Sequence, residues 1–253
     1  MTADPVRLVH LLLAMGRATA FLFVVPVLGG PRVPAILKAG LGFLLAMVSL
    51  VHAPAVALDT GTFLLLLIKE VGVGLFLGWG ISLAFAAIQV AGNILEIQFG
   101  FGAGSVVDPI HAVQSTIVSQ FYAIFGLLLF VGIDGHHLLL RMLARSFELL
   151  PTTGVMPAGG VTSGAVDLFA AAFFSGIQLA APLMIAGLLV EAGLGLVARA
   201  APQMNVFIVS LPLKVGLGIL LMGVFLPAQM GGIAEGIRGA VRDTIQILAG
   251  ARP

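Results

Sequence analysis

The stretch Phe63–Ile97 reads FLLLLIKEVGVGLFLGWGISLAFAAIQVAGNILEI and is predominantly apolar. A helix crosses a bilayer with about 20 mainly apolar residues, so this stretch is too long for one straight span. We expect a helix that is either tilted or continues beyond the bilayer inside a protein assembly. The stretch lacks the strict alternation of apolar and polar residues that is typical of membrane β-strands.

Five further apolar stretches flank this one, which predicts six candidate membrane helices in total. Gly- and Pro-containing breaks separate them, and short breaks between antiparallel helices predict helical hairpins. The fold class is therefore all-α, a helical membrane protein of antiparallel hairpins. Two prolines inside the last two stretches predict kinks in long helices. The five stretches are Val6–Leu28, Pro34–Val51, Ala112–Ile133, Val166–Ala198 and Val206–Gln229, and the prolines are Pro182 and Pro212.

The composition excludes several classes of protein. Of the 253 residues, 60% are hydrophobic and 9% are charged, whereas soluble domains carry about 25% charged residues. A soluble cytosolic enzyme and a disordered chain are both excluded by this balance. The net charge of +1 provides no basic field for nucleic acid, and the lack of cysteine excludes disulfides and thiolate metal sites.

Positive charge in the linkers predicts the orientation of the chain. The relevant residues are Arg141 and Arg145 in the fourth linker and Arg238, Arg242 and Arg252 in the C-terminal tail. The third linker, Gly100–His111, has no Lys or Arg, so the C-terminus is predicted to be cytoplasmic. Six spans would place the N-terminus on the same side. We expect the first helix to be retained, although Ala18-Thr19-Ala20 resembles a signal-peptide cleavage site.

Charged residues interrupt the apolar stretches, and each is costly at the centre of a bilayer, by at least about 2.5–3.5 kcal/mol on insertion scales. They are Arg17, Lys38, Lys69, Glu70, Glu96, Glu191 and Lys214. Arg17 and Lys69 lie near the ends of their stretches. Their long side chains could therefore extend to the membrane interface and keep the charge in water. The embedded charges are expected to pair, to reach the interface or to line a water-filled path. Three of them, Glu96, Glu191 and Lys214, are expected to contact other subunits.

Small residues predict close helix packing in the long central stretch. Gly72, Gly74, Gly78 and Gly80 lie within it, and Gly74 and Gly78 form a GxxxG pair. Such spacing lets two helix backbones approach closely in lipid.

No constellation in the chain indicates catalysis, a cofactor or a metal ion. The segment Asp134-Gly135-His136-His137 holds possible ligands, but adjacent histidines on a helix point about 100° apart and are not expected to converge. The glycines Gly100, Gly102 and Gly104 follow a helix and lack the spacing of a dinucleotide-binding loop.

Four groups of motifs resemble the FliR family of flagellar export-apparatus proteins. The most specific is Arg199–Phe207, which reads RAAPQMNVF and is followed by Leu211-Pro212-Leu213-Lys214. The others are Gln98–Phe101 running to Val107–Pro109, Gly135–Leu138 with Ser146-Phe147 and Leu150-Pro151, and Arg17–Pro26 with Pro34. The resemblance covers about residues 7 to 230.

The resemblance implies a non-enzymatic core subunit of the flagellar type III protein export gate in the bacterial inner membrane, at the flagellar basal body. Its implied partners are the P-type and Q-type export-gate subunits, the B-type switch subunit and unfolded flagellar export substrates. The chain would be one helical domain over 1–253, with an amphipathic tail over 231–253. This tail is expected to lie on membrane lipid or dock a partner, and the alternative is a fraying end of the last helix.

The resemblance also implies roles for particular residues. The loop after the third helix would plug the central pore, where an apolar constriction excludes water and ions. The plug residues are Phe99, Gly100, Phe101, Gly102, Gly104, Val106, Val107, Asp108 and Pro109. The residues expected at contacts between subunits are Glu96, Glu191, Pro202, Gln203, Asn205 and Lys214.

An alternative function is a secondary transporter or permease subunit whose broken helices surround a midplane site. No clear internal repeat supports it. The sequence also does not separate a flagellar member of the family from a relative in virulence secretion.

Overall fold

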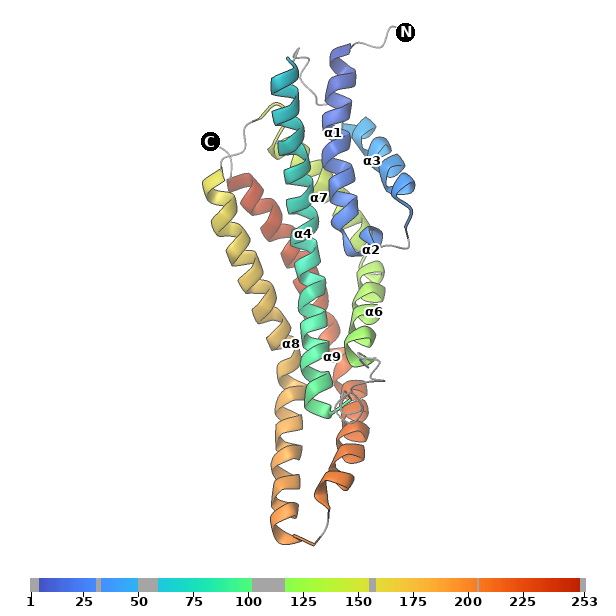
Figure 1. Cartoon of the computed structure of the whole chain (residues 1–253), viewed down its shortest axis with the longest axis vertical. Coiled ribbons are helices and arrows are strands. Elements are labelled where there is room, and N and C mark those ends of the chain that lie inside the picture. Colours follow the sequence, from blue (N-terminus) through green and yellow to red (C-terminus); the bar gives the residue numbers. More distant parts are fainter. Residues whose placement is uncertain are drawn as a thin grey trace. The chain divides into compact units, whose positions relative to one another are not determined.

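A computed structural model describes residues 5–30, 33–49, 59–101, 117–154, 158–203 and 205–250. Within these ranges the regular elements are α-helices and no strand occurs, which confirms the predicted all-α class (Figure 1). The helices are α1 (Pro5–Val24), α2 (Pro26–Gly29), α3 (Ala35–Ser49), α4 (Thr60–Phe99), α6 (Ile117–Gly132), α7 (Gly135–Leu149), α8 (Ala158–Ala200) and α9 (Val206–Gly250).

The chain divides into two compact units. Unit 1 comprises Met1–Ala84, Asp134–Ala170 and Ile237–Pro253, and unit 2 comprises Phe85–Ile133 and Ala171–Gly236. The three longest helices, α4, α8 and α9, each contribute residues to both units. The boundary between the units therefore falls inside continuous helices and not in a linker. The single domain predicted over 1–253 stays a prediction.

The structure corrects the predicted number of membrane spans. Four described helices are long and apolar enough to cross a bilayer, and a fifth span results if α6 and α7 are taken as one broken span. The stretch Pro34–Val51 forms the short helix α3, with an apolar part over Ala35–Val48. The expected fourth linker is also largely helical, because Arg141 and Arg145 lie in α7. The cytoplasmic N-terminus was predicted from an even count of six spans, and the described helices do not give that count.

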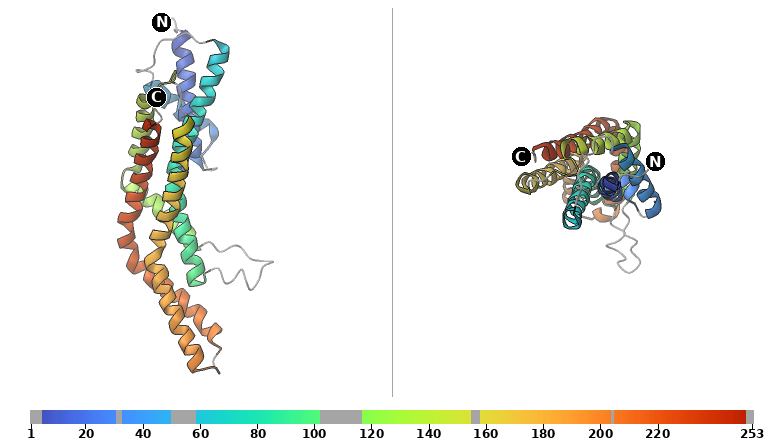
Figure 2. Two further views of the ribbon diagram at one scale, coloured as in Figure 1. Left: turned by 90° about the vertical axis from the view of Figure 1, so that its left-hand side faces the viewer. Right: turned by 90° about the horizontal axis from the view of Figure 1, so that it is seen from above.

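In unit 1, α1 lies between α3 and the first half of α4 (Figures 1 and 2). A Cβ added to Gly74 would come within 2.2 Å of the Arg17 carbonyl oxygen, and one added to Gly78 within 2.7 Å of Val24 Cβ. The two helix backbones therefore touch through the GxxxG pair, as the sequence predicts. Gly72, in contrast, faces open space.

In unit 2, the second part of α8 and the first part of α9 run side by side as a hairpin (Figure 2). Pro182 lies inside α8, and Pro212 and Pro227 lie inside α9, so none of the three ends its helix. In the most apolar windows of α8 and α9, only 17% and 6% of the residues are buried, against 61% in α4. In the described part of the chain, most of the apolar surface of this hairpin is therefore uncovered.

Within the described residues, the predicted C-terminal tail continues α9 without a break as far as Gly250. Ile237 and Leu248 belong to an apolar stripe along the predicted amphipathic tail, and both are buried. Thr244 lies on the same side, and a Cβ added to Gly80 would meet its hydroxyl oxygen at 2.2 Å. This part of the stripe packs within unit 1.

Candidate functional site

Arg17 lies at the centre of a buried ionic cluster in unit 1 that joins α1, α4 and the end of α7. Its Nε and Nη2 groups donate to the two carboxylate oxygens of Glu70 at 2.7 and 2.9 Å. Nη1 donates to the backbone and side-chain oxygens of Ser146, and Nη2 also donates to the carbonyl of Leu150 at 2.7 Å. The guanidinium lies 4.3 Å from the centre of the Phe147 ring. All five N–H groups of Arg17 therefore have an acceptor.

Lys69 adds a second cation to the cluster. Its Nζ lies 2.8 Å from a carboxylate oxygen of Glu70 and donates to the carbonyls of Pro151, Thr152 and Gly154 at 2.7–3.1 Å. His10 joins the same region through a 3.1 Å contact between its Nδ1 and the Thr152 hydroxyl. Lys69 and Arg17 thus bind the end of α7 and the turn after it to α4 and α1.

The cluster argues against the alternative that the Arg17 side chain extends to the membrane interface, and for Lys69 this alternative stays a prediction. The side chains of Arg17 and Glu70 are both 0% exposed. Burying two charges is costly, and the bidentate pairing with the added hydrogen bonds offsets that cost. Because removing one member of a buried pair typically costs about 3–5 kcal/mol, this cluster is a major determinant of how the helices of unit 1 pack.

Lys38 is likewise buried and is satisfied inside unit 1. Its Nζ donates to the carbonyls of Gly29 and Gly30 at 2.8 and 3.2 Å, at the C-terminal end of α2. It also lies 4.8 Å from the centre of the Phe23 ring. A cation at this place stabilises the unpaired carbonyls of a helix end.

In unit 2, the three charged residues predicted at subunit contacts have different surroundings. Glu96 is buried and accepts a hydrogen bond from the backbone N–H of Ser119 at 3.2 Å. Glu191 and Lys214 form an ion pair between α8 and α9, with side chains 46% and 21% exposed. The amide of Gln98 donates to Glu191 at 3.4 Å. Glu191 and Lys214 thus pair with each other at an open surface, and their contact with other subunits stays a prediction.

The end of α4 is fixed by a Schellman motif just before the predicted plug. Gly100 has φ +74°, its N–H donates to the carbonyl of Ile97, and the N–H of Phe101 donates to that of Glu96. Glycine adopts this left-handed conformation without the steric cost that a Cβ brings.

Of the nine predicted plug residues, three lie in the described part of the chain. Phe99 is 1% exposed, and its ring packs on the backbone of Gly218 in α9. Phe99 is therefore an anchor inside unit 2, while Phe101 is partly exposed. The remaining plug residues, Gly102, Gly104, Val106, Val107, Asp108 and Pro109, lie outside the described residues.

The turn between α8 and α9 carries the most specific motif. Pro202, Gln203 and Asn205 are exposed there, and the carbonyl of Asn205 accepts the N–H of Ile208 in the first turn of α9. These three side chains are exposed in the part of the chain that the structure describes, so they are accessible to another molecule.

Sequence reasoning missed a buried polar link in unit 2. The Tyr122 hydroxyl in α6 donates to the Gln229 side-chain oxygen at 2.8 Å, and the Gln229 amide donates to the carbonyl of Leu179 at 3.0 Å. Gln229 marked only the end of an apolar stretch in the sequence. A signal was present, because a polar amide in a buried apolar helix requires hydrogen-bond partners.

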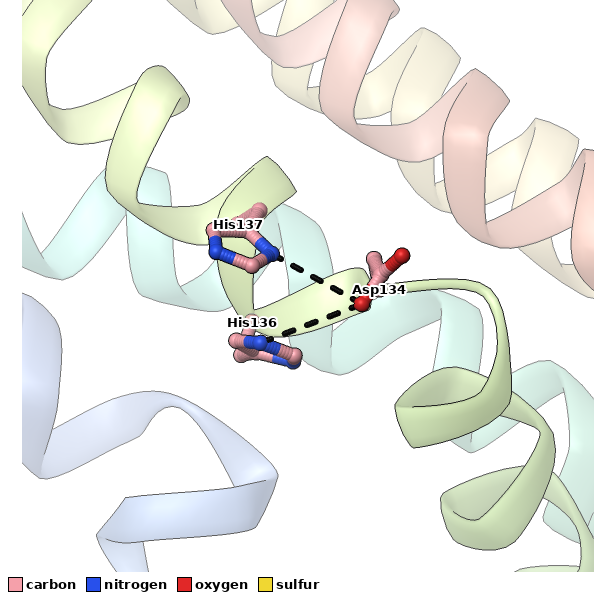
Figure 3. A group of neighbouring side chains, drawn as sticks. All are labelled: Asp134, His136 and His137. Carbon is pink, nitrogen blue, oxygen red and sulfur yellow. Dashed lines mark ion pairs between the residues drawn. The ribbon is translucent and has the colours of Figure 1, made fainter.

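Asp134, His136 and His137 come together at the start of α7 (Figure 3). One possible ligand atom from each lies within 4.8 Å of the others, and the two imidazole rings are 4.2 Å apart between centroids. The expectation that the two histidines do not converge is therefore wrong. Their positions in the first helical turn, after a residue with left-handed backbone, bring the rings to the same side.

Comparison with known proteins identifies the family. Residues 8–239 match the bacterial export proteins, family 1. The flagellar biosynthetic protein FliR of Bacillus subtilis (strain 168) is 35% identical over 217 residues, which cover 83% of this chain and 83% of the relative. The FliR protein of Caulobacter vibrioides (strain ATCC 19089 / CIP 103742 / CB 15) is 30% identical over 242 residues, covering 93% and 94%.

A protein named for translocation is also similar. The Yop proteins translocation protein T of Yersinia pestis is 30% identical over 201 residues, which cover 78% of this chain and 76% of the relative. The residues 8–239 that match the family include the ionic cluster of unit 1, the end of α4 and the α8–α9 turn. The chain belongs to the bacterial export proteins, family 1.

Proposed function

We propose that this chain is a core subunit of the flagellar type III protein export gate. In this role it forms part of the conduit through which unfolded flagellar subunits cross the bacterial inner membrane. The match over residues 8–239 is the observation that carries the proposal, together with relatives named for flagellar biosynthesis and for translocation. These names give no support to the permease alternative.

The surface of the α8–α9 hairpin supports a role within an assembly. Few residues in the most apolar parts of α8 and α9 are buried by the chain itself. Lipid could cover apolar side chains, but Glu191 and Lys214 lie on this surface with partly exposed charges. A charge facing hydrocarbon costs at least about 2.5–3.5 kcal/mol, so a protein surface is the better neighbour for them. The P-type and Q-type subunits are the proposed neighbours.

The segment after α4 is the proposed gate loop. The Schellman motif at Gly100 and the packing of Phe99 on Gly218 support a rigid starting point for it. An apolar loop held at a fixed anchor would close the pore by excluding water. Phe101 and the segment 102–109 are proposed to form the seal, with Phe99 holding its base.

Further partners and the orientation follow from the same proposal. Arg238 and Arg242 are exposed near the end of α9, which supports a cytoplasmic C-terminus. The B-type switch subunit is the proposed neighbour on that side. The role is that of a packed conduit component, and the charged side chains described above serve packing in it and not catalysis.

Co-purification tests the proposal. The full chain, carrying an affinity tag and expressed with its neighbouring membrane proteins, should elute from detergent with at least two other small membrane proteins. A chain that elutes alone and binds a solute by itself would contradict the gate proposal and support the permease alternative. Replacing Pro202 and Gln203 by alanine should lower the yield of the complex, while alanine at the exposed Arg145 in α7 should not.

A second experiment tests the gate loop separately. Deleting 102–105, or replacing Gly102 and Gly104 by leucine, should change ion leakage through the assembled complex or the rate of export. The complex itself should still form, because the anchor at Phe99 and Gly100 is unchanged. Wild-type leakage and export in both variants would reject the plug role.

A further inference from the structure

Asp134, His136 and His137 form a cluster that the proposed export role does not use. The Asp134 carboxylate oxygen lies 3.7 Å from His137 Nδ1 and 4.0 Å from His136 Nε2. Figure 3 shows both rings turned toward this carboxylate. Two ligand atoms on one tetrahedral zinc ion are about 3.3 Å apart, given metal–ligand distances of about 2.0–2.1 Å. Small side-chain rotations would close the remaining gap.

The backbone at Asp134 holds the carboxylate in this place. Asp134 has φ 58°, which makes it the one residue other than glycine with positive φ in the described part of the chain. It occupies the N-cap position of α7, but its side chain makes no capping hydrogen bond. An aspartate at this position usually bonds to the first backbone N–H groups of the helix. Here the carboxylate points to the imidazoles instead, in a strained conformation that is common at functional sites.

We propose that Asp134, His136 and His137 bind a divalent transition metal ion, with zinc, cobalt, nickel and copper as the fitting class. Two imidazole nitrogens and one carboxylate oxygen are borderline ligands that suit these ions better than magnesium or calcium. All three side chains are at least half exposed, so water completes the coordination. Three protein ligands with an open position are the pattern of a zinc site that can exchange a ligand.

Two electrostatic effects act on the site in opposite directions. The positive end of the α7 dipole disfavours a cation at the helix start. The Asp134 carboxylate opposes this effect, since it brings a full negative charge next to the ion. The ion in turn stabilises the left-handed backbone of Asp134, because the coordinated carboxylate fixes the start of α7.

Direct metal titration tests the proposal. The full chain is purified in detergent with a tag that contains no histidine, stripped of metal with a chelator, and titrated calorimetrically with zinc. Cobalt is titrated in parallel, since its visible absorption reports nitrogen and oxygen ligation. We expect one ion per chain, bound more weakly as the pH falls, because imidazole must be neutral to ligate.

Substitutions locate the site. His136→Gln and His137→Gln should each weaken binding by more than about tenfold, since even residues that only support a ligand contribute about 10–100-fold. Asp134→Asn should also weaken binding, and asparagine still tolerates the left-handed backbone. The matched control is Asp243→Asn, which removes an exposed carboxylate beside Arg242 and should leave binding unchanged.

The proposal fails if the His136→Gln/His137→Gln double variant binds zinc as the wild type does, because the ion would then bind elsewhere. It also fails if the wild-type chain shows no zinc binding above that of the double variant. Far-UV circular dichroism of each variant checks that the helices are intact, and the exposed positions make unfolding an unexpected outcome.

Discussion

Arg17 and Lys214 are both cations inside long apolar helices, but they differ in burial and in the number of their hydrogen-bond partners. Arg17 in unit 1 is fully buried, and all its N–H groups bond to oxygens from α4 and the end of α7. Lys214 in unit 2 has one carboxylate partner, Glu191, on a surface that the chain leaves mostly open. The buried cation of the first region has all its hydrogen bonds within the chain, whereas the cation of the second region has one partner and remains partly exposed.

The difference separates a region whose charged groups are bonded within the chain from a region that exposes apolar and charged surface to other molecules. In unit 1, α1 touches α4 backbone to backbone at Gly74, next to the ionic cluster. In unit 2, the α8–α9 hairpin joins to its neighbours through a few polar links such as that of Gln229, and presents apolar side chains outward. Substitutions in unit 1 should therefore alter the stability of the chain, and those on the hairpin surface should alter assembly.

The largest effect is expected from Glu70→Ala, which leaves the buried Arg17 guanidinium without its carboxylate. The free energy of unfolding should fall by about 3–5 kcal/mol, measured by thermal or denaturant unfolding in detergent. The control is Arg145→Ala, which breaks an exposed ion pair with Glu148 in α7 and should change stability by at most about 1 kcal/mol. Equal stability of the two variants would show that the buried Arg17–Glu70 pair contributes no more than an exposed ion pair does.

Gly74→Ala should be the next most harmful change, since the added Cβ would lie 2.2 Å from a backbone oxygen that cannot move aside. Overpacking of this kind destabilises by about 1–3 kcal/mol. Gly72→Ala is the matched control two residues earlier, because nothing lies within 4 Å of its added Cβ. That variant should gain up to about 1 kcal/mol from helix propensity. Unfolding midpoints that move in the same direction would contradict the close contact.

Gly100→Ala should lower the free energy of unfolding by about 1–2 kcal/mol, because the Cβ of alanine disfavours the left-handed backbone conformation that glycine adopts here. Gly100→Asn should lose less than Gly100→Ala, since asparagine tolerates this conformation. Gly216→Ala, in open space inside α9, serves as the control and should lose no stability, as for Gly72→Ala. Unfolding in detergent measures all three, and no loss in Gly100→Ala would argue against the Schellman motif.

Lys214→Ala should change the stability of the isolated chain by less than about 1 kcal/mol, as for other exposed pairs. The yield of the assembled complex should fall markedly, because Glu191 would remain as an unpaired charge in an interface. Adding Glu191→Gln to the same variant should restore part of the yield. Quantitative native gels measure it, and an unchanged yield in Lys214→Ala would mean that the hairpin surface faces lipid.

The smallest effect is expected at Asp59, which lies just before α4 and outside the candidate span. Its carboxylate accepts from the Thr62 hydroxyl and from the N–H groups of Gly61 and Thr62, and these bonds, led by the Thr62 hydroxyl, lower the pKa of Asp59. A lowered folded-state pKa means that the contribution to stability is present above the unfolded pKa and lost as the pH falls through the folded pKa.

Asp59→Ala should therefore be slightly less stable than the wild type near pH 7, and the difference should vanish as the pH falls below the folded-state pKa. Asp59→Asn keeps a capping side chain and should show a weaker dependence on pH. Unfolding midpoints measured from pH 7 down to pH 3 check this. A difference that stays constant over this range would show that the carboxylate does not cap α4.

The described helices fall close to the apolar stretches because helix formation depends on nearby residues. The stretch Phe63–Ile97 lies within the observed α4, and the Gly74–Gly78 spacing indicated its packing face correctly. The number of spans was wrong because an apolar run does not reveal its helix length, as α3 shows. Arg141 and Arg145 were assigned to a linker, although α7 is amphipathic and packs one face inside unit 1.

The amino-acid sequence by itself determined the all-α class, the presence of apolar helices that suit a membrane, and the family. Composition, local spacing and short motifs carry these properties. Tertiary structure alone decided that Arg17 pairs with Glu70, 53 residues away, and bonds to Ser146, 129 residues away. The physical reason is that a buried charge accepts whichever partner the packing of distant helices brings within about 3 Å, and local sequence does not encode that choice.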